Sequence, residues 1–319
     1  MLSEQGLGTL PCQRDHLALD VPKAGADLAH LNPGSGCRSG GLRRHLLPMN
    51  FEPLLIIELA VLGLTTGFLA GLLGIGGGML IGPFLTLILS HRGLSADLSI
   101  KMAIATSMAT IIFTSVSSVR AHHARGAVRW DIVKGMAPGI VLGGMIASIG
   151  IFSVLKGSWL AIFFSFFVGF SATQMFLDKK PKATRQMPGT AGQVAAGTVI
   201  GCLSGLVGAG GGFISVPFMV AHNVLILNAV ATSAALGFPI ALANTVGYVV
   251  SGTGLPDLPP YSLGYVWLPG LAVIATCSVF TAPWGARMAH QLPIAKLKKV
   301  FAIVLYSLSA YMLFKGISG

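Results

Sequence analysis

A glycine-rich motif that occurs twice constrains the fold of this chain more than any other feature. The first copy covers residues 71–84 and the second covers residues 205–218, so the two are 134 positions apart. The residues that recur at this offset are five glycines and one proline, in the pairs Gly71/Gly205, Gly74/Gly208, Gly76/Gly210, Gly77/Gly211, Gly78/Gly212 and Pro83/Pro217. This agreement indicates a tandem duplication, and it predicts that the function lies between the two halves.

Each glycine triplet lies within a long apolar run, where it is expected to break a helix. One glycine inside a helix costs about 0.5–1 kcal/mol relative to alanine. A helix broken inside a membrane must have its freed N–H and C=O groups met by protein or by water. Transporters hold substrates at such breaks, where helix N-terminal N–H groups face an anion. Close helix packing through Gly67/Gly71 and Gly201/Gly205 is the alternative, but packing requires small residues at intervals rather than a triplet.

The composition is that of an all-α polytopic membrane protein. Hydrophobic residues make up 53% of the 319 residues, charged residues make up 10%, and the mean hydropathy is +0.77. Soluble domains carry about 25% charged residues. The net charge of +11 does not indicate a nucleic-acid partner, because the basic residues lie between apolar runs, where the positive-inside rule places them. The four cysteines show no metal-ligand spacing, and we expect no metal and no cofactor.

The apolar segments predict about eight full transmembrane helices and two short helices that follow the glycine breaks. Residues 1–50 are expected to be a disordered extension, or to result from a start site upstream of the true one, with Met49 as an alternative initiator. Residues 51–180 form the first transmembrane repeat and residues 181–319 the second. The predicted helices cover residues 54–73, 79–90, 99–119, 131–153, 158–177, 193–207, 213–221, 226–250, 264–286 and 297–315.

Whether the short helices cross the membrane decides how the two halves are oriented. If they cross, the halves are inverted, and the loops at 120–130, 178–185 and 287–299 share one face with eleven Lys and Arg residues, against four to six opposite. If they do not cross, the halves are parallel, and the two faces of the membrane carry ten and seven Lys and Arg residues. The positive-inside rule therefore favours inverted repeats with both termini outside.

Polar residues inside the apolar runs are the candidate ligands. Ala105-Thr106-Ser107 in the first half recurs as Ala231-Thr232-Ser233 in the second. Such hydroxyls either bond the carbonyl four residues earlier or contact a ligand. Asn244 also lies in an apolar run, where its amide either joins helices or meets a polar substrate.

A basic cluster follows the third predicted helix, and no catalytic motif accompanies it. Arg120, His122, His123 and Arg125 either attract an anion or obey the positive-inside rule. The chain contains no G-x-S-x-G, H-E-x-x-H or Walker sequence, so we expect no enzymatic activity.

The doubled glycine motif and the two Ala-Thr-Ser elements resemble those of the TauE/SafE sulfite exporter-like family. The late segments 263–266 and 281–287 are also similar to that family, and the resemblance covers about residues 53–315. It implies a permease for small sulfur-containing or organic anions such as sulfite, sulfoacetate or thiosulfate. Export is the expected direction, and proton coupling is a further expectation. The N-terminal extension departs from the family pattern.

Together these features predict a multi-pass secondary transporter of the bacterial inner membrane that works by alternating access. Its partners would be a small anion and the lipid bilayer, with no nucleic acid, and a homo-oligomer remains an open alternative. An anion channel and a membrane accessory or sensor subunit without flux are the other interpretations of the same residues. The residues predicted to bind the substrate are Gly76, Gly77, Gly78, Thr106, Ser107, Gly210, Gly211, Gly212, Thr232, Ser233 and Asn244. The residues predicted to be structural are Gly71, Gly74, Pro83, Gly205, Gly208 and Pro217.

Overall fold

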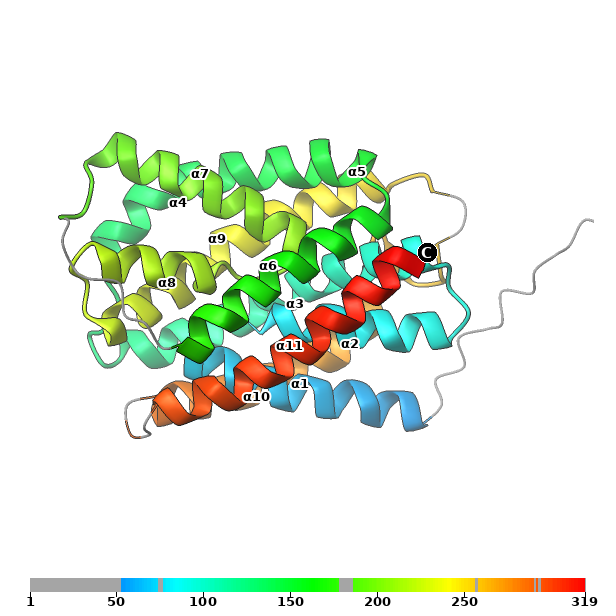
Figure 1. Cartoon of the computed structure of the whole chain (residues 1–319), viewed down its shortest axis with the longest axis horizontal. Helices are drawn as coiled ribbons and strands as arrows, with labels where there is room; N and C mark the ends of the chain where they lie inside the picture. Colours follow the sequence, from blue (N-terminus) through cyan, green and yellow to red (C-terminus); the bar gives the residue numbers. More distant parts are fainter. Residues whose placement is uncertain are drawn as a thin grey trace, which may run out of the picture. The chain divides into compact units, whose positions relative to one another are not determined.

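The computed structural model describes residues 53–73, 77–177, 186–255, 258–289, 291 and 294–318, which are mainly helical (Figure 1). The predicted extension at residues 1–50 lies outside this part of the chain. The helices are α1 (Pro53–Leu73), α2 (Gly78–His91), α3 (Ala96–His123), α4 (Trp130–Met145), α5 (Phe152–Val154), α6 (Gly157–Leu177), α7 (Thr190–Val207), α8 (Gly212–Ala221), α9 (Ile226–Gly252), α10 (Leu268–Met288) and α11 (Ile294–Ser318). A π-helical segment, η1 (Ile146–Ile151), joins α4 to α5.

The predicted class, a polytopic helical membrane protein, is confirmed. Eight helices in the described part of the chain are long and apolar enough to cross a membrane, and α2 and α8 are the shorter apolar helices. Large apolar side chains point outward from these spans. Phe166, Phe170, Phe280, Trp284 and Phe314 are each more than 60% exposed. On a soluble protein they would form an aggregation-prone surface, whereas here they face lipid.

The predicted start of the penultimate helix was wrong. Residues 262–267 form a small hairpin in which β1 (Ser262–Leu263) pairs antiparallel with β2 (Val266–Trp267), and α10 begins only at Leu268. Gly264 takes φ 55° in the turn. Few residues other than glycine adopt this conformation. The third helix is also longer than predicted, because it begins at Ala96, where the Ser95 hydroxyl accepts a hydrogen bond from Leu98 N and so caps the helix.

Two pairs of helices pack closely through glycine, and each pair takes one helix from each half. In the first pair, Gly63, Gly67 and Gly71 of α1 lie against Ile274, Ser278 and Ala282 of α10. In the second pair, Gly139 and Gly143 of α4 lie against Val194 and Thr198 of α7. The contacts advance by four residues on both members, so both pairs are parallel.

The helix directions follow from these pairs and from contacts between helix ends. His122 near the end of α3 contacts Gly71 near the end of α1, and Trp267 just before α10 contacts Thr106 in the first half of α3. Helices α1, α3, α6 and α10 therefore run one way, and α4, α7, α9 and α11 run the other. Helix α2 returns the chain to the end from which α1 started, and α8 does the same after α7.

Basic side chains gather at one end of this bundle. The end at which α1, α3, α6 and α10 finish is called the basic end here. Among the described residues it carries Arg120, Arg125, Arg129, Lys134, Arg287 and Lys299, and the opposite end carries Arg92, Lys101, Lys156 and Lys315. Helices α6 and α11 lie side by side in Figure 1, and their antiparallel contact includes hydrogen bonds between Ser165 and Ser309.

Gly67→Val is expected to lower the stability of the protein. A Cβ at this position would collide with the backbone of Ser278, so α1 and α10 would have to separate. Overpacking of this kind costs typically about 1–3 kcal/mol. The measurement is the thermal unfolding midpoint in detergent. Gly150→Val is the matched control, because a Cβ at Gly150 meets no atom within 4 Å. Equal midpoints for the two variants would contradict the role of glycine packing.

Candidate functional site

Both short helices begin at a glycine in the left-handed conformation. Gly77 has φ 73° and Gly211 has φ 74°. Glycine adopts such angles without a steric cost. The first helical hydrogen bonds run from Leu80 N to Gly77 O (3.1 Å) and from Ile214 N to Gly211 O (3.0 Å). The two residues between, 78–79 and 212–213, thus belong to the helix N-termini, whose N–H groups have no partner within the helix. Gly74 and Gly76 lie outside the described residues.

The two glycine breaks meet inside the bundle. Gly78, the first residue of α2, lies against the carbonyl oxygen of Gly208 and the Cα of Ala209, so any side chain at Gly78 would collide with the second break. The Ser107 hydroxyl of α3 lies 2.9 Å from the oxygen of Gly208 and 2.8 Å from that of Ile104. The predicted ligands Gly78 and Ser107 are therefore brought to the second break.

A small cavity, lined in part by Ser and Thr residues, adjoins the second break. Its volume is about 10 Å³. This is about the space that one water molecule needs. The residues that line it come from α1, α3, α9 and the break, and they are Ala70, Thr114, Ser115, Ser118, Gly210, Ser233, Ala234 and Gly237. The predicted ligands Gly210 and Ser233 thus share one cavity with three hydroxyls of α3. The Ser118 hydroxyl is buried and has no hydrogen-bond partner among the described residues.

Sequence reasoning missed the α3 hydroxyls, although a signal for them exists. Thr106, Thr110, Thr114 and Ser118 recur every four residues and therefore share one face of α3. Thr110 donates to Thr106 O and Thr114 donates to Thr110 O, so these two hydroxyls find acceptors within the helix itself. Ser118 continues the row and is the member that borders the cavity without a partner in the described part of the chain.

The two predicted threonine ligands hold the two halves together. The Thr106 hydroxyl accepts a hydrogen bond from Trp267 N (3.0 Å), and the Thr232 hydroxyl accepts one from Arg129 N (3.0 Å). Both threonines are fully buried. Trp267 and Arg129 are the residues just before α10 and α4, so each threonine fixes the start of a helix in the other half.

Asn244 is fully buried between the two helices of a close pair. Its side chain lies against Gly144 of α4 and Gly205 of α7. Nδ2 donates to Ile240 O (2.8 Å), whereas Oδ1 has no partner in the described part of the chain. The amide therefore joins helices through one atom and leaves the other unpaired.

The carbonyl oxygens ahead of both breaks are held by ring side chains that sequence reasoning did not assign. His122 Nε2 lies 3.2 Å from Gly71 O, and the Tyr248 hydroxyl donates to Gly205 O. His122 is thus buried and separated from the exposed Arg120 and Arg125 of the basic cluster. Aligning the two Ala-Thr-Ser elements places His122 opposite Tyr248 and Ser118 opposite Asn244, and this match was visible in the sequence.

The predicted structural residues occupy close contacts or helix interiors. Gly71 and Gly205 lie against Ala282 and Asn244, and Gly208 takes φ 75° at the end of α7. Gly212, which was predicted to bind the substrate, is the buried first residue of α8. Pro83 and Pro217 lie inside α2 and α8, where each removes one helical hydrogen bond.

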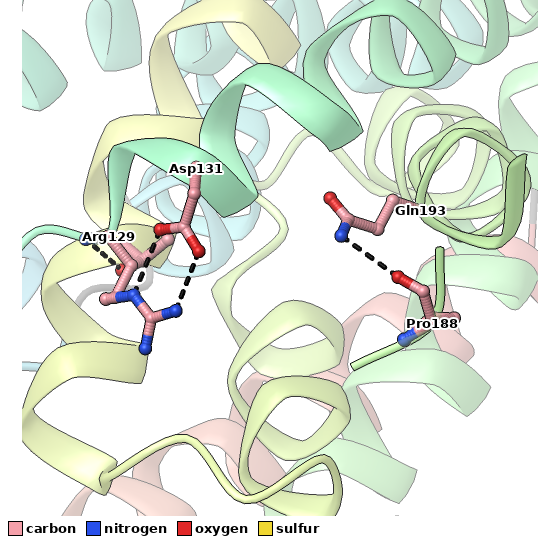
Figure 2. A network of polar contacts seen from close by, with 5 residues as sticks. Arg129, Asp131, Pro188 and Gln193 are labelled. Atoms are coloured by element: carbon pink, nitrogen blue, oxygen red, sulfur yellow. Dashed lines mark hydrogen bonds and ion pairs between the residues drawn. The ribbon is translucent and has the colours of Figure 1, made fainter. Parts of the chain in front are cut away.

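A polar contact network marks the starts of α4 and α7 at the basic end. Figure 2 shows Arg129 and Asp131 facing each other, with Arg129 Nε 3.0 Å from Oδ1 and Nη2 2.7 Å from Oδ2. Hydrogen bonding and attraction to Asp131 raise the pKa of the Arg129 guanidinium. Gln193 Nε2 donates to Pro188 O nearby. The ion pair is exposed and is worth about 1 kcal/mol or less.

Comparison with known proteins defines the class. The chain is 36% identical over 261 residues to a "probable membrane transporter protein" of Haemophilus influenzae, covering 82% of this chain and 98% of the relative. It is 28% identical over 281 residues to the "probable membrane transporter protein YunE" of Bacillus subtilis, covering 82% and 98%. With eight apolar spans in the described part of the chain, it is a multi-pass membrane transporter.

The family follows from a match to most of the chain. The family model described as sulfite exporter TauE/SafE matches residues 59–312, and the chain belongs to this family. A relative from Methanocaldococcus jannaschii, also called a probable membrane transporter protein, is 24% identical over 275 residues, covering 84% of this chain and 99% of the relative. No solved structure matches the chain.

Thr106→Val is expected to destabilise the protein, because it leaves the N–H of buried Trp267 without a partner. An unsatisfied buried donor of this kind costs about 1–3 kcal/mol. The measurement is again the unfolding midpoint in detergent. Thr106→Ser keeps the hydroxyl and is expected to unfold near the wild-type temperature. A valine variant as stable as the serine variant would show that this hydrogen bond contributes nothing.

Proposed function

We propose that this protein is a secondary transporter that moves small sulfur-containing or organic anions, such as sulfite, sulfoacetate or thiosulfate, by alternating access. We further propose that it exports them, that protons drive the cycle, and that it works in the bacterial inner membrane. The observation that carries the proposal is the meeting of the two glycine breaks beside a hydroxyl-lined cavity.

The anion would be held by neutral donors at this meeting point. The N-terminal N–H groups of α2 and α8 supply positive helix ends. The Ser118 hydroxyl supplies a further donor, the Ser115 and Ser233 hydroxyls border the same cavity, and the described part of the lining contains no ionised side chain. Oriented dipoles replace the hydration of the anion without a buried counter-charge, which keeps binding weak enough for release.

Asn244 extends the proposed site toward α4 and α7. Its Oδ1, which has no partner in the described part of the chain, is an acceptor and would repel an anion. Rotation of the amide would turn Nδ2 toward the unpaired position. The rotation also turns Oδ1 toward the carbonyl oxygen of Ile240, so the hydrogen bond to the substrate must offset both this repulsion and the lost bond from Nδ2. This gives Asn244 a different partner in the empty and the loaded protein.

The size of the cavity favours a carrier over a channel. A cavity that holds only one water molecule is too small for a sulfur oxyanion. The surrounding helices must therefore move for the substrate to enter. A channel would conduct without that movement and would show currents far above carrier turnover. An accessory or sensor subunit would bind the anion without flux.

Inverted repeats are part of the proposal. Matched contacts support them, since α1 pairs with α10 as α4 pairs with α7, and Thr106 bonds Trp267 as Thr232 bonds Arg129. The excess of Arg and Lys at the basic end supports a cytoplasmic location for that end. Rocking of one half against the other would then expose the meeting point to each side in turn.

Flux of sulfite into proteoliposomes, with and without an imposed pH gradient, tests the proposal. Saturable flux driven by the gradient is expected. Ser233→Ala removes one hydroxyl from the cavity with little change in volume. We expect an increase in KM of about 10–150-fold, which corresponds to the loss of one hydrogen bond to a charged group. Unchanged kinetics in this variant would place the substrate elsewhere.

Gly77→Val and Gly211→Val are expected to abolish flux. Valine does not adopt the left-handed φ of these two positions. Its Cβ would also meet Thr66 O at the first break or Ile240 at the second. Gly189→Val is the matched control, because Gly189 is extended and a Cβ there meets nothing within 4 Å. Folded protein is verified by a single symmetric peak in size-exclusion chromatography. If both variants fold and transport normally, the breaks do not form the site.

A further inference from the structure

A second and much larger pocket lies at the basic end between α3 and α10. Its volume is about 740 Å³. Its lining includes three apolar residues, Phe113, Val116 and Val279, and three arginines, Arg120, Arg125 and Arg287. A pocket of this size holds an organic molecule rather than a single small anion.

This pocket is separate from the proposed transport site. Phe113, Val116 and Arg120 recur at spacings of three and four residues and so lie on one face of α3. Ser115 and Ser118, which line the small cavity, lie on the opposite face. Helix α3 therefore stands between the two. The side chain of Phe113 is 49% exposed, and this exposure places the pocket on the lipid-facing side of the bundle.

The arginines in the pocket are available for a ligand. The ion pairs found in the described part of the chain, Lys101 with Asp97 and Arg129 with Asp131, include none of them. Arg125 Nη1 donates to Ala121 O and has further N–H groups to offer. Guanidinium groups bind phosphate through two parallel hydrogen bonds, which makes arginine suited to phosphate recognition.

The apolar and basic parts of the pocket are separated along α3. Arg120 is seven residues after Phe113, which corresponds to about two helical turns. The arginines lie toward the end of the helix, where the membrane surface is, and the apolar residues lie toward the membrane interior. A ligand that fits has an anionic head and an apolar chain.

The described positions of α9 that correspond to Arg120 and Arg125 are uncharged. Aligning α9 with α3 through the Ala-Thr-Ser elements places Val246 opposite Arg120 and Ser251 opposite Arg125. The packing of these helices therefore does not require arginine at either position. Packing therefore does not explain the charge of this pocket, which lies at the end of the bundle where the positive-inside rule also places basic residues.

We infer that this pocket binds an anionic phospholipid of the leaflet at the basic end. The phosphate contacts Arg120, Arg125 and Arg287, and an acyl chain lies along Val116, Phe113 and Val279. Charge complementarity identifies the occupant, since a zwitterionic lipid offers no net charge to three cations. Because α10 packs against α1, a lipid here also braces the helix that leads into the first glycine break.

Native mass spectrometry of the purified protein tests this inference. The full chain in detergent is titrated with phosphatidylglycerol and, separately, with phosphatidylcholine of the same acyl chains. Each basic residue near an anionic head contributes about fivefold to affinity, so the double variant Arg120→Gln/Arg287→Gln is expected to bind phosphatidylglycerol about 30-fold more weakly. Lys134→Gln/Lys299→Gln, which removes two exposed charges from the same end but outside the pocket, is expected to bind as the wild type does.

Two further measurements distinguish binding of the acyl chain from binding of the head group. Val116→Phe narrows the apolar part and keeps every charge, and it is expected to weaken phosphatidylglycerol binding. Glycerol 3-phosphate, which has the head without the chains, is expected to bind at least tenfold more weakly than the lipid. Equal losses in the two double variants would mean unspecific charge attraction and would overturn the inference. Undiminished binding in Val116→Phe, or glycerol 3-phosphate binding as tight as the lipid, would also overturn it.

Discussion

A helix that stops inside apolar surroundings leaves backbone groups that something else must bond, and this requirement organises the centre of the molecule. Side chains from α3 and α9 meet the carbonyl side: His122 holds Gly71 O, Tyr248 holds Gly205 O and Ser107 holds Gly208 O. The N–H groups that open α2 and α8 have no such partner within their helices. Among the described residues, side chains therefore bond carbonyl oxygens at both breaks, while the N-terminal N–H groups have no partner within their own helices, an arrangement that suits an anion.

The same glycines that break two helices allow others to approach closely. Helices α1 and α10, and α4 and α7, pack backbone against backbone through glycine, and each pair joins the two halves. Thr106 and Thr232 add a hydrogen bond from each half to a helix start in the other. We therefore expect these contacts to transmit a change at one break to the other half. Alternating access needs such coupling, because only one side of the site is open at a time.

The sequence predicted the class, the helix breaks and most helix positions, since each depends on local residue chemistry. Apolar runs set the spans, and the glycine triplets set the left-handed turns at Gly77 and Gly211. The hairpin before α10 was missed, because each of its strands has only two residues, which is too short to show the alternation of polar and apolar residues typical of a strand. Contacts that depend on packing between distant helices were also missed, namely the unpaired Ser118 beside the cavity and the bond from Tyr248 to Gly205 O, both among the described residues. The recurrence of the Ala-Thr-Ser element held part of this information, since aligning its two copies pairs Ser118 with Asn244 and His122 with Tyr248.

The central claim is that the two glycine breaks form one anion site together. Equilibrium binding of radiolabelled sulfite to the purified protein tests it most directly, through the number of anions bound per chain. We predict one sulfite per chain, and we predict that Gly77→Val or Gly211→Val alone removes that binding completely. Two anions per chain, with each variant losing only one of them, would contradict the claim, because the breaks would then be independent sites.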